Sequence, residues 1–133
     1  MSGAPEPRFI GADVAQAVHD RQLAEHGGLA GTKDIGLLES ALARPINRFN
    51  YGETDPCALE ASYAFGIARN HPFADGNKRT AWVMARLFLM LNGVQISFDK
   101  ADAIRMMLAL ASGSLEEEAV AAWFREHIVT AAE

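Results

Sequence analysis

The stretch from Ala81 to Leu91 constrains the fold of this chain more than any other segment. Apart from Arg86, all of its residues are apolar. A helix that is apolar on every side must be surrounded by other elements of the protein. This stretch is also far shorter than the ~20 residues that a membrane-spanning helix needs. We therefore expect a central buried helix inside a globular domain, and no membrane span.

Helix signals recur along the rest of the chain and predict an all-α fold. Asp55-Pro56 places an N-cap residue before a proline at the first helical position, which is a strong helix start. Ser114 and Glu117 have the spacing of a capping box. Six helices are expected: Ala12 to His26; Ile35 until Pro45 ends or kinks the run; a helix from Pro56; the apolar helix, which Asn92-Gly93 closes; one capped by Asp99, with the inward face Ala103, Ile104, Met107, Leu110 and Ala111; and one after Ser114.

Length and composition exclude several classes of protein. The 133 residues are fewer than the roughly 150 of a typical domain, so a single domain over residues 1–133 is expected. The 12 basic and 17 acidic residues give a net charge of −5, which argues against direct nucleic acid binding. Cys57 is the only cysteine, so we expect a buried free thiol. Because no secretory signal is evident, we expect a cytoplasmic location.

The densest group of reactive side chains lies between His71 and Arg79, in the sequence His-Pro-Phe-Ala-Asp-Gly-Asn-Lys-Arg. This segment leads into the apolar helix, where unpaired backbone N–H groups and the helix dipole favour an anion. Gly76 permits close approach of the backbone, and Asn77, Lys78 and Arg79 add donors and positive charge. The pattern predicts a site for the phosphates of a nucleotide.

Asp75 and His71 add chemistry to this phosphate site. A carboxylate at position 75 would repel a phosphate unless a hard cation such as Mg²⁺ lies between them. A histidine can accept the proton of an attacking hydroxyl near neutral pH. Phe73, which lies between the two in sequence, is expected to anchor the loop in the core.

Each motif residue also has an ordinary structural interpretation. His71 can be a loop residue, Asp75 a helix cap, and Lys78 and Arg79 a solvated first turn. Their joint position at one helix N-terminus favours the functional interpretation. The segment is not a Walker A loop, because the Gly-x4-Gly-Lys-Ser/Thr spacing is absent around Gly76.

Residues 71–79 resemble the signature of the Fic/Doc family. The resemblance continues through residues 19–22, the Gly27-Gly28 pair, residues 36–45 and Asn92-Gly93. It is strongest toward the Doc (death-on-curing) toxin branch of Phd/Doc-type toxin–antitoxin systems. It implies a compact six-helix Fic fold in which an active-site loop precedes the central buried helix.

The resemblance also implies an activity and the residues that perform it. The expected protein is a toxin that uses Mg²⁺ and ATP to transfer the γ-phosphate to a Ser or Thr hydroxyl of elongation factor Tu, which arrests translation. A Phd-like antitoxin would be its partner. In this scheme the catalytic base is His71, the metal ligand is Asp75, and the anion hole consists of Gly76, Asn77, Lys78 and Arg79.

Two departures from the AMP-transferase pattern of the family bear on which group is transferred. That pattern reads Gly-Asn-Gly-Arg with a second arginine three residues later. In this chain Lys78 replaces the glycine, and Trp82 stands at the position of the second arginine. Loss of an arginine that binds the outer phosphates favours γ-phosphate transfer. AMP transfer, and a non-catalytic module that binds a nucleotide or an antitoxin, stay open as alternatives.

Two other segments have possible regulatory or binding roles. The stretch from Gly31 to Gly36 is the candidate for the family's flap, which holds the target backbone by strand-like pairing; an ordinary glycine-rich connection is the alternative. Residues 114–118 loosely match an inhibitory motif of some Fic proteins. Ala119 follows where that motif has Gly or Asn, so we expect no built-in inhibitory helix.

Overall fold

The computed structural model describes residues 6–129 and confirms the all-α, six-helix prediction. Within these residues, β-structure is limited to two isolated bridges, Thr32 with Phe73 and Ile96 with Ile128. No helix in the described range is long and apolar enough to cross a membrane. The helices are α1 (Ala12–His26), α2 (Ile35–Asn50), α3 (Pro56–Asn70), α4 (Asn77–Leu91), α5 (Lys100–Ser112) and α6 (Glu117–Glu126).

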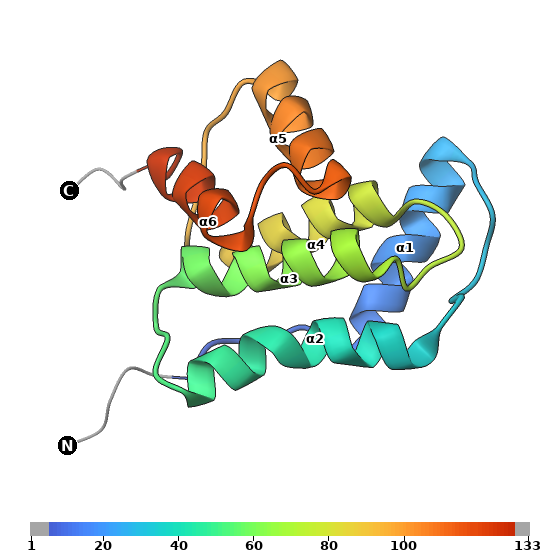
Figure 1. The fold of residues 1–133 in the computed structure, drawn as a ribbon, viewed down its shortest axis with the longest axis horizontal. Coiled ribbons are helices and arrows are strands. Elements are labelled where there is room, and N and C mark those ends of the chain that lie inside the picture. The colour runs from blue at the N-terminus through green and yellow to red at the C-terminus, as the bar shows by residue number, and fades with distance from the viewer. Residues whose placement is uncertain (1–5, 130–133) are drawn as a thin grey trace.

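Helix α3 lies at the centre of the fold, with α2 on one side, α5 and α6 on the other, and α4 packed along its length (Figure 1). Asp55 accepts a hydrogen bond from the Cys57 N–H, as expected of an N-cap. Cys57 is fully buried, and this burial raises the pKa of its thiol to about 12. Helix α4 is not surrounded on every side as its composition predicted: one face is buried, Val83 and Leu87 are only partly buried, and Met90 and Leu91 at its end are exposed.

Close contact between α2 and α3 depends on Gly66. A Cβ at this position would lie 3.0 Å from the Cβ and 3.1 Å from the Cα of Ala41. We expect Gly66→Ala to lower the free energy of unfolding by about 1–3 kcal/mol, because the helices would have to separate. Urea denaturation measures this change. Gly11→Ala is the matched control, since a Cβ at Gly11 meets no atom within 4 Å; equal effects of the two substitutions would contradict the prediction.

The structure decides one open point about the predicted helices and corrects two others. Of the two effects considered for Pro45, ending the helix is excluded, because α2 continues to Asn50. The proline ring is buried, and this burial offsets the one missing backbone hydrogen bond. Ile104 is not on the inward face of α5 but 50% exposed. Finally, Ser114 and Glu117 do not form a capping box: the N-cap of α6 is Glu116, and it makes no side-chain cap.

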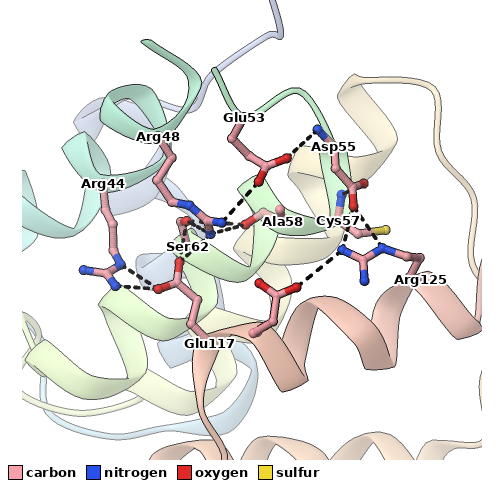
Figure 2. Close-up of polar contacts among 10 residues, drawn as sticks. Arg44, Arg48, Glu53, Asp55, Cys57, Ala58, Ser62, Glu117 and Arg125 are labelled. Carbon is pink, nitrogen blue, oxygen red and sulfur yellow. Dashed lines mark hydrogen bonds and ion pairs between the residues drawn. The ribbon is translucent and has the colours of Figure 1, made fainter. Parts of the chain in front are cut away.

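The carboxylate of Glu117 binds α2 and α3 instead of its own helix (Figure 2). It accepts hydrogen bonds from Arg48 at 2.8 Å, from Ser62 at 2.6 Å, and from Arg44. Burial acts to raise the pKa of Glu117, but hydrogen bonds from Arg44 and Ser62 outweigh burial and lower the pKa below its usual value. Two guanidinium partners stabilise a carboxylate more than one backbone N–H does, which explains why the cap does not form.

Glu60 is fully buried in α3, and neither carboxyl oxygen has a hydrogen-bond partner among residues 6–129. Burial, and after it the charge of Asp55, raises the pKa of Glu60 well above 4.5. The folded chain therefore keeps a proton that the unfolded chain releases near pH 4.5, so this group makes the protein less stable as the pH rises above that value.

Glu60→Met should remove this pH-dependent cost. We expect the free energy of unfolding at pH 8 to increase by about 1–3 kcal/mol, because an unpaired buried polar group is removed. The increase should be smaller at pH 5. Denaturant titrations at both pH values measure it, with the exposed Glu39 changed to Met as the control. A loss of stability at pH 8 would show that the carboxyl of Glu60 has a favourable role.

Candidate active site

The loop of residues 71–76, here called the motif loop, joins α3 to α4 (Figure 1). His71 closes α3 in the left-handed conformation, with φ 52° and ψ 56°. It is the one non-glycine residue with positive φ in the described part of the chain. Such a conformation is strained for a residue with a Cβ. It turns the chain away from α3 and leaves the His71 side chain exposed.

Phe73 and Asn77 hold the motif loop in place. The Phe73 side chain is 1% exposed, which confirms the predicted anchor. The side-chain Oδ1 of Asn77 accepts a hydrogen bond from the Phe73 N–H at 3.0 Å, and its Nδ2 donates to the Phe73 carbonyl at 3.0 Å. The Asn77 amide therefore braces the loop with both ends, a role that sequence reasoning missed when it treated this side chain only as an anion donor.

His19 of α1 is a second support that sequence reasoning missed. Its ring is buried and stacks on Phe73, with 3.9 Å between ring centroids and an interplanar angle of 7°. Its Nε2 lies 2.7 Å from the carbonyl oxygen of Asp75. A carbonyl only accepts, so Nε2 carries the proton and donates it. In the sequence, what pointed to a role for His19 was that residues 19–22 belong to the stretches that resemble the family.

The Asp75 carboxylate is held by two backbone N–H groups. Its Oδ1 accepts from Gly76 at 2.9 Å and its Oδ2 from Leu29 at 3.3 Å. A Cβ on Gly28 would lie 2.9 Å from Oδ2, so the glycine after α1 makes room for this carboxylate. The side chain of Asp75 remains exposed on the pocket side of the loop.

All six predicted site residues line one pocket of about 670 Å³ at the N-terminus of α4. The opposite wall comes from α5, through Leu108, Ala111 and Ser112. The proximity of the six residues follows from their positions in sequence, whereas the α5 wall comes from the tertiary fold. The motif residues in the wall are His71, Asp75, Gly76, Asn77, Lys78 and Arg79.

The charges around this pocket suit an anion. Lys78 and Arg79 are exposed, and neither makes an ion pair with a residue between 6 and 129. No acidic residue lies in the first turn of α4, where backbone N–H groups lack intrahelical partners. The positive end of the helix and two cations therefore face the same space, an arrangement that attracts phosphate.

A single carboxylate beside an anion site suits Mg²⁺, which also takes ligands from phosphate and water. It does not suit a metal whose ligands must all come from the protein. The described residues contain no cluster of three or more His, Cys, Asp or Glu side chains that could hold a metal ion. Mg²⁺ is commonly bound by one or two carboxylates together with phosphate oxygens and water. The Asp75 carboxylate, next to the anion site, supplies that kind of donor.

The candidate flap lies against the motif loop. Thr32 forms an antiparallel bridge with Phe73, the Lys33 N–H donates to the Pro72 carbonyl at 2.8 Å, and the Ala74 N–H donates to the Gly31 carbonyl at 3.1 Å. Residues 31–34 thus lie beside the loop, with bends at Gly31 and Lys33 and a single bridge at Thr32. Ile35 already begins α2, so the non-helical part is two residues shorter than expected.

Comparisons with known proteins agree with the motif. Residues 9–89 match the model of the Fic/DOC family. The chain is 38% identical over 115 residues to a protein named "Protein kinase doc" from Escherichia phage P1, covering 86% of this chain and 90% of that protein. It is also 38% identical over 100 residues to "Toxin Doc" from Mycolicibacterium smegmatis, covering 72% of this chain and 77% of the relative.

Proposed function

This chain belongs to the Fic/Doc family, and from that membership we propose that it is the toxin of a toxin–antitoxin system and transfers the γ-phosphate of ATP to a protein hydroxyl. The names of its two relatives, a kinase and a toxin, support both parts. The observation that carries the proposal is the convergence of all six motif residues on one cationic pocket at the N-terminus of α4.

His71 acts as the general base in this proposal. The exposed imidazole takes the proton from a Ser or Thr hydroxyl of the target, and the hydroxyl oxygen forms a bond to the γ-phosphorus. The bond between the γ-phosphorus and the bridging oxygen breaks, and that oxygen leaves with its electron pair as part of ADP. The left-handed turn at His71 directs the chain into the motif loop, so the base and the anion site share one pocket.

The N-terminus of α4 holds the phosphates. Backbone N–H groups from Asn77 onward, together with the side chains of Lys78 and Arg79, bind the charge on the phosphate oxygens, while Gly76 lets the backbone approach them closely and its N–H donates to Asp75. Asp75 would hold Mg²⁺, which neutralises charge on the phosphates when bound. Asn77 contributes by fixing the loop through Phe73, and the Asp75 carbonyl is fixed by His19.

The environment of Trp82 favours phosphate transfer over AMP transfer. Its indole ring packs against Phe98 and Phe124, with centroid distances of 5.1 and 5.6 Å. An apolar residue therefore occupies the position at which the AMP-transferase pattern has a second arginine for the outer phosphates. Lys78 adds a cation where that pattern has glycine. AMP transfer is kept as the second candidate, because the base and the anion site would serve either reaction.

The proposed target and the proposed inhibitor rest on membership of the family, not on a feature of the pocket. Elongation factor Tu is the proposed substrate, with translation arrest as the result. A Phd-like antitoxin is the proposed partner, and its disordered tail would fold on binding. The flap at residues 31–34 is the proposed surface for the target backbone.

Intact-mass measurement tests the function. Purified elongation factor Tu is incubated with this protein, ATP and Mg²⁺. We expect a gain of about 80 Da, the mass of one phosphoryl group. A gain of about 329 Da would show AMP transfer and overturn the γ-phosphate assignment. If the mass of elongation factor Tu does not change but another protein of a cell extract gains one phosphoryl group, the proposed chemistry would hold and the proposed target would be wrong.

A further inference from the structure

Ser112, the last residue of α5, lines the same pocket as the motif residues and is exposed. Among the described residues that line this pocket, it is the only one with a hydroxyl group. The proposed reaction transfers phosphate to a serine or threonine hydroxyl. The pocket therefore contains a possible acceptor that belongs to the protein itself.

Two hydrogen bonds from α3 fix the part of the chain that carries Ser112. The Nε of Arg69 donates to the Leu110 carbonyl at 2.9 Å, and its Nη2 donates to the Leu115 carbonyl at 3.0 Å. Leu110 precedes Ser112 by two residues. On the other side of this contact, His71 follows Arg69 by two residues. The end of α5 is therefore held against the end of α3, and both Ser112 and His71 reach the pocket from this junction.

The Ser112 hydroxyl can leave its present hydrogen bond at little cost. Its Oγ donates to the Ala109 carbonyl at 3.1 Å. The same carbonyl accepts from the backbone N–H groups of Ser114 at 3.0 Å and Leu115 at 3.1 Å. Because a carbonyl oxygen has two lone pairs, these N–H groups already satisfy it. Turning the hydroxyl toward the pocket therefore leaves no acceptor without a donor.

The cations of the pocket suit a phosphate on Ser112. Lys78 and Arg79 line the pocket with it and make no ion pair within residues 6–129. A phosphoserine carries up to about two negative charges, which the negative end of the α5 dipole disfavours. The two cations of the same pocket are the groups that compensate this charge. A phosphate on Ser112 and the phosphates of a nucleotide thus compete for the same cations.

We infer that Ser112 is an acceptor for the protein's own transferase activity, and that a phosphate placed there closes the anion site to the next nucleotide. This inference rests on the proposed function, because it uses the same base and the same γ-phosphate. His71 takes the proton from the Ser112 hydroxyl, and Oγ forms a bond to the γ-phosphorus. The bond between the γ-phosphorus and the bridging oxygen breaks, and that oxygen leaves with its electron pair as part of ADP.

Mass spectrometry of the protein alone tests this inference. The whole chain is incubated with ATP and Mg²⁺ without any target protein. We expect a gain of about 80 Da, the mass of one phosphoryl group, and peptide mapping should place this group on Ser112. The fraction modified in a given time should be independent of protein concentration, because the base and the acceptor lie in one chain.

Variants of the two serines at the end of α5 identify the acceptor. Ser112→Ala should abolish self-phosphorylation, whereas Ser112→Thr should keep it, since threonine retains a hydroxyl. Ser114→Ala is the matched control and should be phosphorylated like wild type. The Oγ of Ser114 lies 3.2 Å from that of Ser112, but Ser114 does not line the pocket.

The affinity for ATP tests the closure of the anion site. Calorimetry compares the protein phosphorylated at Ser112 with the unmodified protein. We expect phosphorylation to weaken ATP binding at least about tenfold, because the added charge competes for Lys78 and Arg79. An unchanged affinity would overturn the closure.

The outcomes separate this inference from the proposed function. If the protein phosphorylates a target but gains no mass on its own, or gains it on another residue, the inference is overturned and the function stands. A modified fraction that rises with protein concentration would also overturn it, because the acceptor would then be presented by a second molecule. If Ser112 gains AMP instead of phosphate, the acceptor is correct and the γ-phosphate assignment fails.

Discussion

Replacing His71 with asparagine is expected to reduce phosphate transfer at least ~100-fold, the usual cost of removing a general base, with little change in ATP affinity. Asparagine is preferred to alanine here because it tolerates the left-handed conformation that His71 adopts, at φ 52°. The variant therefore removes the imidazole without adding backbone strain. Rates of phosphate incorporation from labelled ATP, together with calorimetric ATP affinities, measure the two effects separately.

Two controls make the His71 result interpretable. His26 at the end of α1 is exposed and lies outside the lining of the pocket, so His26→Asn should keep wild-type activity. His71→Ala should resemble His71→Asn in activity but lose some stability. If His71→Asn binds ATP normally and transfers phosphate at the wild-type rate, the base must be another group, and the proposed mechanism is wrong.

Replacing Asp75 with asparagine is expected to reduce transfer about 100-fold at fixed Mg²⁺ and to raise the Mg²⁺ concentration needed for half-maximal activity. The carboxylate accepts hydrogen bonds from Gly76 on one oxygen and from Leu29 on the other. An amide can keep only one of these and turns a donor toward the other N–H. Because the loss of charge and the loss of one hydrogen bond occur together, folding must be measured alongside activity.

The dependence of the transfer rate on Mg²⁺ concentration distinguishes a metal ligand from a loop brace. Asp20→Asn, an exposed carboxylate of α1 outside the pocket, is the matched control and should leave the dependence unchanged. Leu29→Pro removes the N–H that donates to Oδ2 and, although it also fixes the φ angle of residue 29, it tests the brace without changing the carboxylate. If Asp75→Asn is slow at every Mg²⁺ concentration but has the wild-type half-maximal value, Asp75 braces the loop and does not bind the metal.

Local sequence signals predicted most of the helices correctly. The start of α3 at Asp55-Pro56 and the Asp99 cap of α5 are present, because an N-cap depends on a side chain and backbone groups two or three residues away. The same reasoning failed at Ser114 and Glu117. There the local pattern was correct, but Arg44, Arg48 and Ser62 compete for the same carboxylate, and these residues are far away in sequence.

The sequence by itself determined the all-α fold and the membership of the site, since a nine-residue motif at one helix N-terminus stays together in any tertiary arrangement. Only the tertiary structure decided what surrounds it. The stacking of His19 on Phe73, the space at Gly28 for the Asp75 carboxylate, and the α5 wall of the motif pocket at Leu108, Ala111 and Ser112 all bring distant segments together. Their geometry depends on how the helices pack, which no local pattern records.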